Sequence, residues 1–227
     1  MVTPSEEPGN ARLERREQIL RAARAAIEEF GPEALTGDIA KRAGLARPNV
    51  YRHFSSKDNL DLAVARSTTQ ELLAAIREQL DLSGTPLDVI RAPIKAQVIW
   101  ADCHPNLYRF LVSRGMYQFL AGQGSKRRSK QRGAEHSGFA SELTAVAARY
   151  FPRYTENPYA AEATVIGVAA LIDASVLHWL DRRTELRDEL IGRLTDLAWL
   201  VTDHHLCKFG VQLDPARPLP QTWQTPS

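Results

Sequence analysis

The chain has 227 residues, of which 44% are hydrophobic and 25% charged, and its formal net charge is +2. This length fits one large domain or two small ones, and the composition excludes a fully disordered chain, a collagen and a coiled-coil rod. Because the net charge is small, only local clusters of basic residues could indicate a polyanionic partner.

The cysteines and the apolar stretches predict the compartment. Cys103 and Cys207 are too few for a disulfide framework and fit a reduced, intracellular protein. Residues 1–10 are polar and lack the apolar core of a secretory signal. The most apolar stretch, residues 163–180, contains Asp173 and His178, which favours a buried helix over a membrane span. We therefore expect a cytoplasmic protein without a membrane partner.

Apolar residues recur at helical spacing along the chain, which predicts an all-α fold. Residues 1–12 are expected to form a flexible tail. Residues 13–30 predict a helix whose apolar stripe ends at Phe30, and the Gly-Pro pair that follows should stop it.

Two short helices are expected next. Thr36 can cap the first, Gly44 supplies the turn, and Pro48 stands near the start of the second, where its missing N–H costs nothing. The sequence from Ser55 then resembles a capping box that opens a longer helix over residues 56–82.

The helix over residues 56–82 changes its apolar face halfway along, which predicts that it belongs to two hydrophobic cores. We place the domain junction near Ser67, inside this helix. The expected domains are residues 13–66, residues 67–209 and an extended C-terminal tail over residues 210–227.

Further helices are expected in the second domain. A capped helix begins at residues 85–88 and should kink or break at Pro93. The later expectations are helices over residues 107–117, 139–151, 158–180 and 185–208, and a mobile basic loop over residues 122–138.

The strongest functional signal is a cluster of positive charge around the two short helices. The segment from Lys41 to Lys57 contains five basic residues and no acidic one. Two short helices with a basic surface, joined by a glycine turn, are typical of a helix-turn-helix, whose second helix enters the major groove of DNA.

These residues also resemble a known family. The segments Ile39–Leu45, Val50–Phe54 and Ser56–Leu60 resemble the TetR family of bacterial transcriptional regulators. The likeness is specific over residues 15–62. It implies a three-helix DNA-binding domain joined through a shared helix to a larger helical ligand-binding and dimerisation domain. The implied function is a homodimeric repressor of a near-palindromic operator on double-stranded DNA, released by a small hydrophobic effector.

The resemblance also assigns roles within the DNA-binding domain. Arg47 and Asn49 would meet bases, since Arg can pair with guanine and Asn with adenine, whereas Tyr51, His53 and Lys57 would bind phosphates. The full predicted DNA-binding set is Thr36, Arg47, Pro48, Asn49, Tyr51, Arg52, His53 and Lys57.

Two residues and one interval depart from the usual TetR pattern. Ala46 replaces a capping Ser or Thr, and Pro48 replaces a small residue. The interval over residues 31–39 is also one residue shorter than is common.

A second set of residues predicts the dimer interface. Small residues recur along one side of the helix over residues 158–180, and leucines follow a 3.5-residue repeat in the last helix. The resemblance places both helices at the dimer axis; packing within one subunit is the alternative. The candidates are Ala163, Ile166, Gly167, Ala170, Ala174, Leu190, Leu194, Leu197 and Val201.

Aromatic and polar residues in the second domain are candidates for a hydrophobic effector pocket, and core packing is the alternative reading. The set comprises Trp100, Cys103, Tyr108, Leu111, Arg114, Met116, Tyr117, Phe119, Asp173, Leu177 and His178.

Other functions remain open. The chain could be an activator or an effector-independent regulator, a small-molecule carrier, or a helical metal- or haem-binding protein using Cys103, His104, His204 and Cys207. Two ligands per helix do not make a structural zinc site, and no catalytic triad, nucleotide-binding or zinc-protease motif is present. We therefore expect no enzyme activity, no metal and no cofactor.

Overall fold

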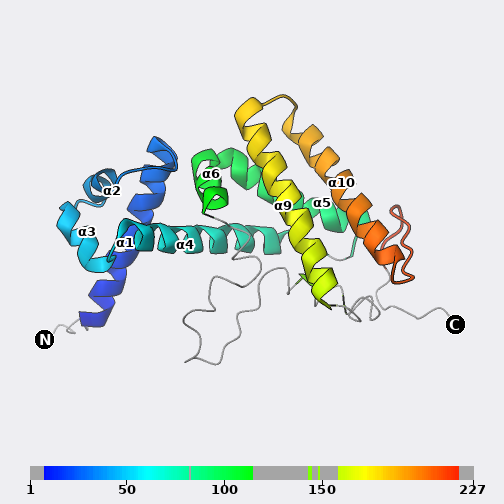
Figure 1. Cartoon of the computed structure of the whole chain (residues 1–227), viewed down its shortest axis with the longest axis horizontal. Coiled ribbons are helices and arrows are strands. Elements are labelled where there is room, and N and C mark those ends of the chain that lie inside the picture. The colour runs from blue at the N-terminus through cyan, green and yellow to red at the C-terminus, as the bar shows by residue number, and fades with distance from the viewer. Residues whose placement is uncertain (1–7, 82, 115–142, 145–147, 149–157, 220–227) are drawn as a thin grey trace, which may run out of the picture. The chain divides into compact units, whose positions relative to one another are not determined.

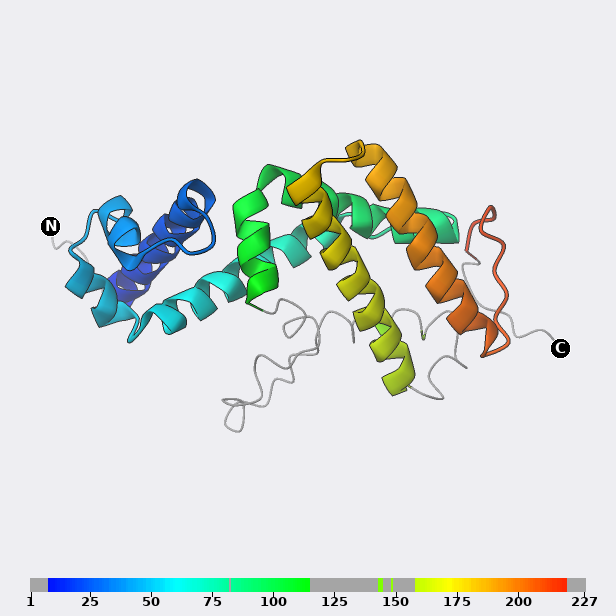
Figure 2. The same ribbon diagram turned by 45° about the horizontal axis from the view of Figure 1, so that its top comes forward.

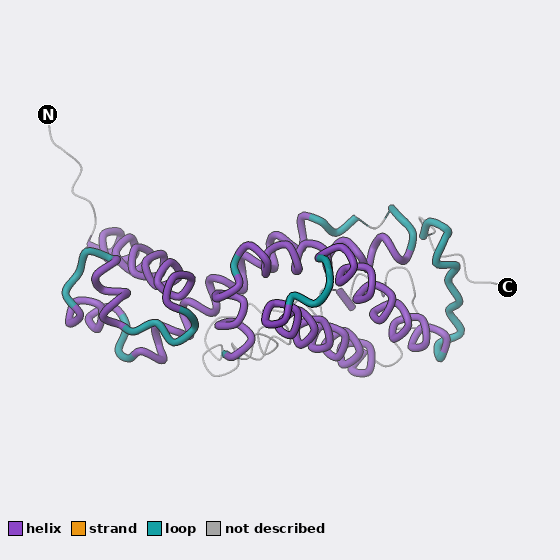
Figure 3. Tube along the Cα trace, turned by 90° about the horizontal axis from the view of Figure 1, so that it is seen from above, coloured by secondary structure: helices purple, strands orange, loops and turns teal. Residues whose placement is uncertain are grey.

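The computed structural model describes residues 8–81, 83–114, 143–144, 148 and 158–219. These residues form helices and loops and contain no strand (Figure 3), so the all-α prediction is confirmed. The helices are α1 (Pro8–Phe30), α2 (Thr36–Arg42), α3 (Arg47–His53), α4 (Lys57–Glu78), α5 (Pro86–Cys103), α6 (Pro105–Ser113), α9 (Pro158–Arg182) and α10 (Arg187–Cys207).

The chain divides into two compact units. The first consists of residues 1–70 and 104–114, and the second of residues 71–103 and 115–227. Helix α4 runs through the boundary, and the chain returns to the first unit in α6. The sequence assigned residues 104–114 to the second domain, but α6 packs against α1, a long-range contact that no local pattern signals.

In the first unit, α1 packs against α2 and α6, and α2 packs against α3 (Figure 1). The stripe predicted for α1 is buried from Ile19 to Ile27, but Phe30 is 56% exposed because the chain turns away at Gly31, where φ is 92°. Helix α1 also begins at Pro8, earlier than predicted, since proline is well tolerated in the first turn.

The predicted helix starts can be compared with the caps. Ser56 Oγ accepts the N–H of Asn59 at 3.1 Å, which is the serine half of the capping box predicted at the start of α4. The residue that precedes α2 is Leu35, not Thr36. The N–H of Leu35 donates to Asp38 Oδ2 at 3.3 Å. The start of α2 is therefore capped by the acid in its first turn and not by Thr36.

In the second unit, α10 packs against α5 and α9. In Figure 2, α9 runs beside α10 and α5 crosses behind both. Helix α5 runs through Pro93 without ending, so of the predicted kink or break, the break does not occur. The chain after α10 folds back, because Val211 is buried against Ala161 and Leu206. The predicted loop over residues 122–138 lies outside the described residues, as does most of the predicted helix over residues 139–151.

Candidate DNA-binding site

The turn between α2 and α3 is held by backbone geometry. Gly44 adopts φ of 64°, a left-handed conformation that glycine reaches without steric cost. The turn closes with the N–H of Leu45 donating to the carbonyl of Ala40 at 2.9 Å. Gln18 of α1 donates from Nε2 to the carbonyl of Ala43 at 3.0 Å, which ties the turn to the body of the unit.

Helix α3 has one buried and one exposed side. Val50 is fully buried, and Phe54 directly after the helix is nearly so. The opposite side carries exposed residues, with Asn49 half-buried among them: Arg47, Pro48, Tyr51 and Arg52. Pro48 lies in the first turn, and Ala46 before the helix makes no side-chain cap. A short helix anchored on one side, with cations and an amide on the other, suits insertion into the major groove.

Three of the predicted DNA-binding residues, Thr36, Arg47 and Tyr51, form a group beside the exposed side of α3. The hydroxyls of Tyr51 and Thr36 are hydrogen-bonded at 3.4 Å, and the Arg47 guanidinium lies 5.8 Å from the Tyr51 ring centre. The hydrogen bond with Thr36, followed by that with Arg47, lowers the pKa of Tyr51. Thr36 itself is only 5% exposed, so its hydroxyl positions Tyr51.

The end of α3 is fixed by Arg16 of α1. Its Nη1 donates to the carbonyl of His53 at 2.8 Å, and its guanidinium lies 4.0 Å from the centre of the Phe54 ring. Burial, and then the nearby guanidinium groups of Arg12, Arg15 and Arg16, lower the pKa of His53. His53 is therefore neutral at pH 7, so it could bind a phosphate as a hydrogen-bond donor rather than as a cation.

Lys57, the last predicted phosphate contact, already has a partner. Its Nζ lies 2.5 Å from Oδ1 of Asp61, one turn further along α4. Asp61 Oδ2 also accepts from Arg114 at 2.8 Å, and Arg114 follows the last residue of α6. The effector role predicted for Arg114 has no support in this placement, which puts the guanidinium on a carboxylate of the DNA-binding unit.

The other end of α6 is also tied to α1. The Glu28 carboxylate accepts the N–H groups of Asn106 at 3.3 Å and Leu107 at 3.1 Å. Asn106 Nδ2 donates to the Glu28 carbonyl at 2.9 Å. A carboxylate at the N-terminus of a helix accepts from the free N–H groups and interacts favourably with the positive end of the helix dipole. Glu28 of α1 therefore acts as an N-terminal cap for α6.

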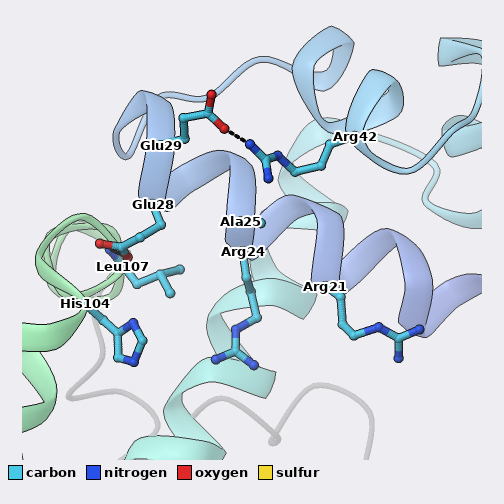
Figure 4. A pocket seen from close by; sticks show the side chains of 8 residues that line it. All are labelled: Arg21, Arg24, Ala25, Glu28, Glu29, Arg42, His104 and Leu107. Carbon is cyan, nitrogen blue, oxygen red and sulfur yellow. Dashed lines mark hydrogen bonds and ion pairs between the residues drawn. The ribbon is translucent and has the colours of Figure 1, made fainter.

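An open hollow of about 540 Å³ lies beside this cap. Figure 4 shows Arg21 and Arg24 extending from α1 on the side where His104 lies, while Glu28 turns toward Leu107. Its remaining acid, Glu29, pairs with Arg42. The acids of the hollow thus serve to hold α2 and α6 on α1.

The effector candidates fall into both units. Tyr108 and Leu111 are buried in the first unit, and Trp100 in the second. Asp173 is buried and accepts from Gln97 Nε2 at 2.6 Å. Leu177 is half-buried, whereas Cys103 and His178 are exposed. Met116, Tyr117 and Phe119 lie outside the described residues.

The dimer candidates separate by burial. The small residues of α9 lie on an exposed side of the helix: Ala163, Gly167, Ala170 and Ala174. Ile166 and Leu197 are half-buried, and Val201 is 40% exposed.

Leu190 and Leu194 are fully buried within their own chain, so placing them at a dimer surface was wrong. A 3.5-residue repeat marks a helix–helix seam without saying which chain supplies the partner. Leu200 of α10, which is not in the predicted dimer set, is 65% exposed.

Helix α9 is more exposed than predicted. Residues 160–182 form a stretch that is long and apolar enough to span a membrane. Its most apolar part has a mean hydropathy of 1.7, and only 22% of that part is buried within the chain. The prediction of a buried helix therefore fails for this chain taken alone. The Asp173–Gln97 hydrogen bond shows that one side packs within the unit, while the small residues of the other side are exposed among the described part of the chain.

The described residues contain no group of three or more His, Cys, Asp or Glu side chains that could hold a metal ion. Cys103 and Cys207 are both exposed and free. Nothing in this part of the chain therefore supports a metal site built from Cys103, His104, His204 and Cys207.

The anchored, cation-bearing α3 after a glycine turn defines a DNA-binding protein of the helix-turn-helix class. The family model of bacterial regulatory proteins of the tetR family matches residues 19–64, which contain this whole arrangement. This part of the chain is therefore similar to the DNA-binding unit of bacterial regulatory proteins of the tetR family.

Individual relatives extend the likeness. The HTH-type transcriptional activator FasR of Mycolicibacterium smegmatis is 38% identical over 101 residues, 44% of this chain and 46% of that protein. The nucleoid occlusion factor SlmA of Vibrio cholerae is 30% identical over 110 residues, 48% of this chain and 56% of that protein. The chain thus matches about half the length of these relatives.

A solved structure supports the fold beyond the DNA-binding unit. A TetR-family regulator from Streptomyces coelicolor aligns with a TM-score of 0.62 and 20% identity, covering 87% of this chain and 85% of that one. At this identity the likeness shows the fold alone.

Proposed function

We propose that this chain is a cytoplasmic, non-catalytic transcriptional regulator that binds a near-palindromic operator as a homodimer. The observation that carries the proposal is α3, with its apolar side buried and Arg47, Tyr51 and Arg52 exposed. Arg47 and Asn49 read bases, and Tyr51 and His53 bind phosphates. One head reads few base pairs, so two heads related by a two-fold axis provide the specificity.

The DNA-binding experiment is a selection of genomic fragments by the purified protein, followed by a salt titration on the enriched fragments. We expect a near-palindrome whose affinity falls steeply with salt. Arg47→Ala should relax base preference, whereas Arg77→Ala removes an exposed arginine from α4 in the second unit and should not. Absence of an enriched sequence from a folded, ligand-free dimer would refute the proposal.

The exposed small-residue side of α9 supports the dimer. Small side chains let two helices approach closely, and an uncovered apolar helix needs a partner surface. Ala170→Arg should convert the dimer to a monomer in sedimentation. The matched variant Ala74→Arg, at an exposed position of α4, should leave it dimeric. If both variants sediment as the wild type does, the interface lies elsewhere.

We further propose that a small hydrophobic ligand binds the second unit and releases the operator, so that the protein acts as a repressor. Buried Trp100 and the Asp173–Gln97 pair inside an apolar helix layer support such a ligand. Reporter expression with and without the protein gives the sign of regulation. An increase caused by the protein would favour an activator, the role that the name of FasR gives to that relative.

A further inference from the structure

The inference concerns Asp61, a carboxylate that holds two cations. Asp61 is 2% exposed, and each of its oxygens has its own partner. Oδ1 lies 2.5 Å from Lys57 Nζ and Oδ2 lies 2.8 Å from Arg114 Nη2. A buried carboxylate is stable only while its charge is countered, so the two cations share this task.

The two cations differ in what else they could do. Lys57 is the first residue of α4, at the helix end proposed to face DNA phosphate, and its side chain is 28% exposed. Arg114 directly follows α6, and its guanidinium also lies 5.6 Å from the centre of the buried Phe110 ring. The side chain of Arg114 is itself 35% exposed, but its guanidinium contacts both Asp61 and the Phe110 ring. Lys57 lies at the start of α4 and pairs with Asp61, so its ammonium can turn outward when that ion pair opens.

A phosphate contact by Lys57 removes one of the two counter-charges from Asp61. If Asp61 had no other partner, the contact would leave a buried carboxylate unpaired, and that penalty would oppose DNA binding. With Arg114 in place, the carboxylate keeps a partner and the three groups together retain a charge of +1. The lysine can then exchange a carboxylate for a phosphate at little cost.

We infer that Arg114 is a positioning residue for operator binding: by pairing with Asp61 it releases the Lys57 ammonium to a DNA phosphate. This inference rests on the proposed function. It assigns to Arg114 an effect on DNA affinity that requires no contact between Arg114 and DNA. It also makes the affinity of the α4 N-terminus depend on where α6 ends.

The test compares the salt dependence of operator binding among full-length variants. Losing one phosphate contact lowers the slope of log affinity against log salt by about 0.9 per head. We expect this decrease in Arg114→Ala and in Lys57→Ala. The double variant Arg114→Ala/Asp61→Asn should return to the wild-type slope, because a neutral side chain no longer retains the lysine. Arg114→Lys should keep the wild-type slope.

Arg109→Ala is the matched control, since it removes an arginine from the same helix. Arg109 donates to Asn106 at 3.3 Å and has no role in the inference. The slope of log affinity against log salt for Arg109→Ala should therefore equal that of the wild type. If Arg114→Ala is too unstable to measure, Arg114→Gln with and without Asp61→Asn gives the same comparison.

The outcomes separate this inference from the proposed function. A wild-type protein with no salt-dependent operator binding refutes the proposed function itself. A wild type with a steep slope, and an Arg114→Ala variant with the same slope, overturns the inference alone. A lowered slope that Asp61→Asn does not restore also overturns it, because Arg114 would then act only through the stability of α6.

Discussion

The glycine turn between α2 and α3 allows a prediction with a built-in control. Gly44 has φ of 64°, and a Cβ placed on it meets no atom within 4 Å. Gly44→Ala therefore adds backbone strain without a clash. Left-handed strain for an L residue costs roughly 1–2 kcal/mol, partly offset by about 0.4–1 kcal/mol from the restricted unfolded chain. We expect a net loss of roughly 0.5–1 kcal/mol in the free energy of unfolding.

Gly37 provides the comparison, because it also has open space around its Cβ position but lies inside α2 at an ordinary negative φ. Gly37→Ala should stabilise the first unit by about 0.5–1 kcal/mol, since alanine favours the helix. The free energy of unfolding should therefore fall in Gly44→Ala and rise in Gly37→Ala, so the two variants should differ by roughly 1–2 kcal/mol.

The assay must report on the first unit. Tryptophan fluorescence is unsuitable, because all four tryptophans lie at position 100 or later and outside residues 104–114. Amide hydrogen exchange of α2 and α3, read by mass spectrometry, follows the opening of this unit directly. Stabilisation by Gly44→Ala equal to that by Gly37→Ala would refute the left-handed turn and the reasoning from it.

Three further predictions follow from the contacts of the first unit. Glu28→Ala should lower stability by about 1–2 kcal/mol in hydrogen exchange of α6, because two N–H groups lose their acceptor, whereas Glu29→Ala should lose less than about 1 kcal/mol since its ion pair is exposed. Ser56→Ala should cost about 1 kcal/mol in thermal unfolding through the lost cap of α4. Folding lowers the pKa of His53, so the unfolded chain binds the proton first and the free energy of unfolding falls as the pH drops below about 6.5. In urea unfolding at pH 7.5 and 5.5, His53→Gln should lose less stability on acidification than the wild type does. An equal loss in the two proteins would argue against the lowered pKa.

The DNA-binding unit could be predicted from the sequence because its signals are short-range. The glycine turn, the cap at Ser56 and the buried Val50 and Phe54 all follow from residues a few positions apart. Charge, turn and packing signals agreed there, which is what makes a local prediction reliable.

The ties of α6 could not be predicted in the same way. Glu28 and its partner Leu107 are separated by 79 positions, and Arg114 and Asp61 by 53. No pattern of spacing relates such residues, so the sequence alone places Arg114 with the aromatic side chains that lie near it along the chain. The burial of Leu190 and Leu194 could not be predicted for the same reason. A 3.5-residue repeat indicates that a helix packs against another helix, but it does not show which helix, or which chain, that is.

Carboxylates of α1 and α4 hold the two ends of α6. Glu28 binds the backbone at the start of the helix, and Asp61 binds Arg114 just after its end. Both ties are directional hydrogen bonds to charged groups, which weaken steeply as geometry is lost. Movement of α6 along its axis would therefore strain both ties together, while Lys57 shares one of the carboxylates. If Lys57 binds a DNA phosphate as inferred above, the position of α6 and the availability of this lysine are coupled through charge as well as packing, and a change at either is expected to appear at the other.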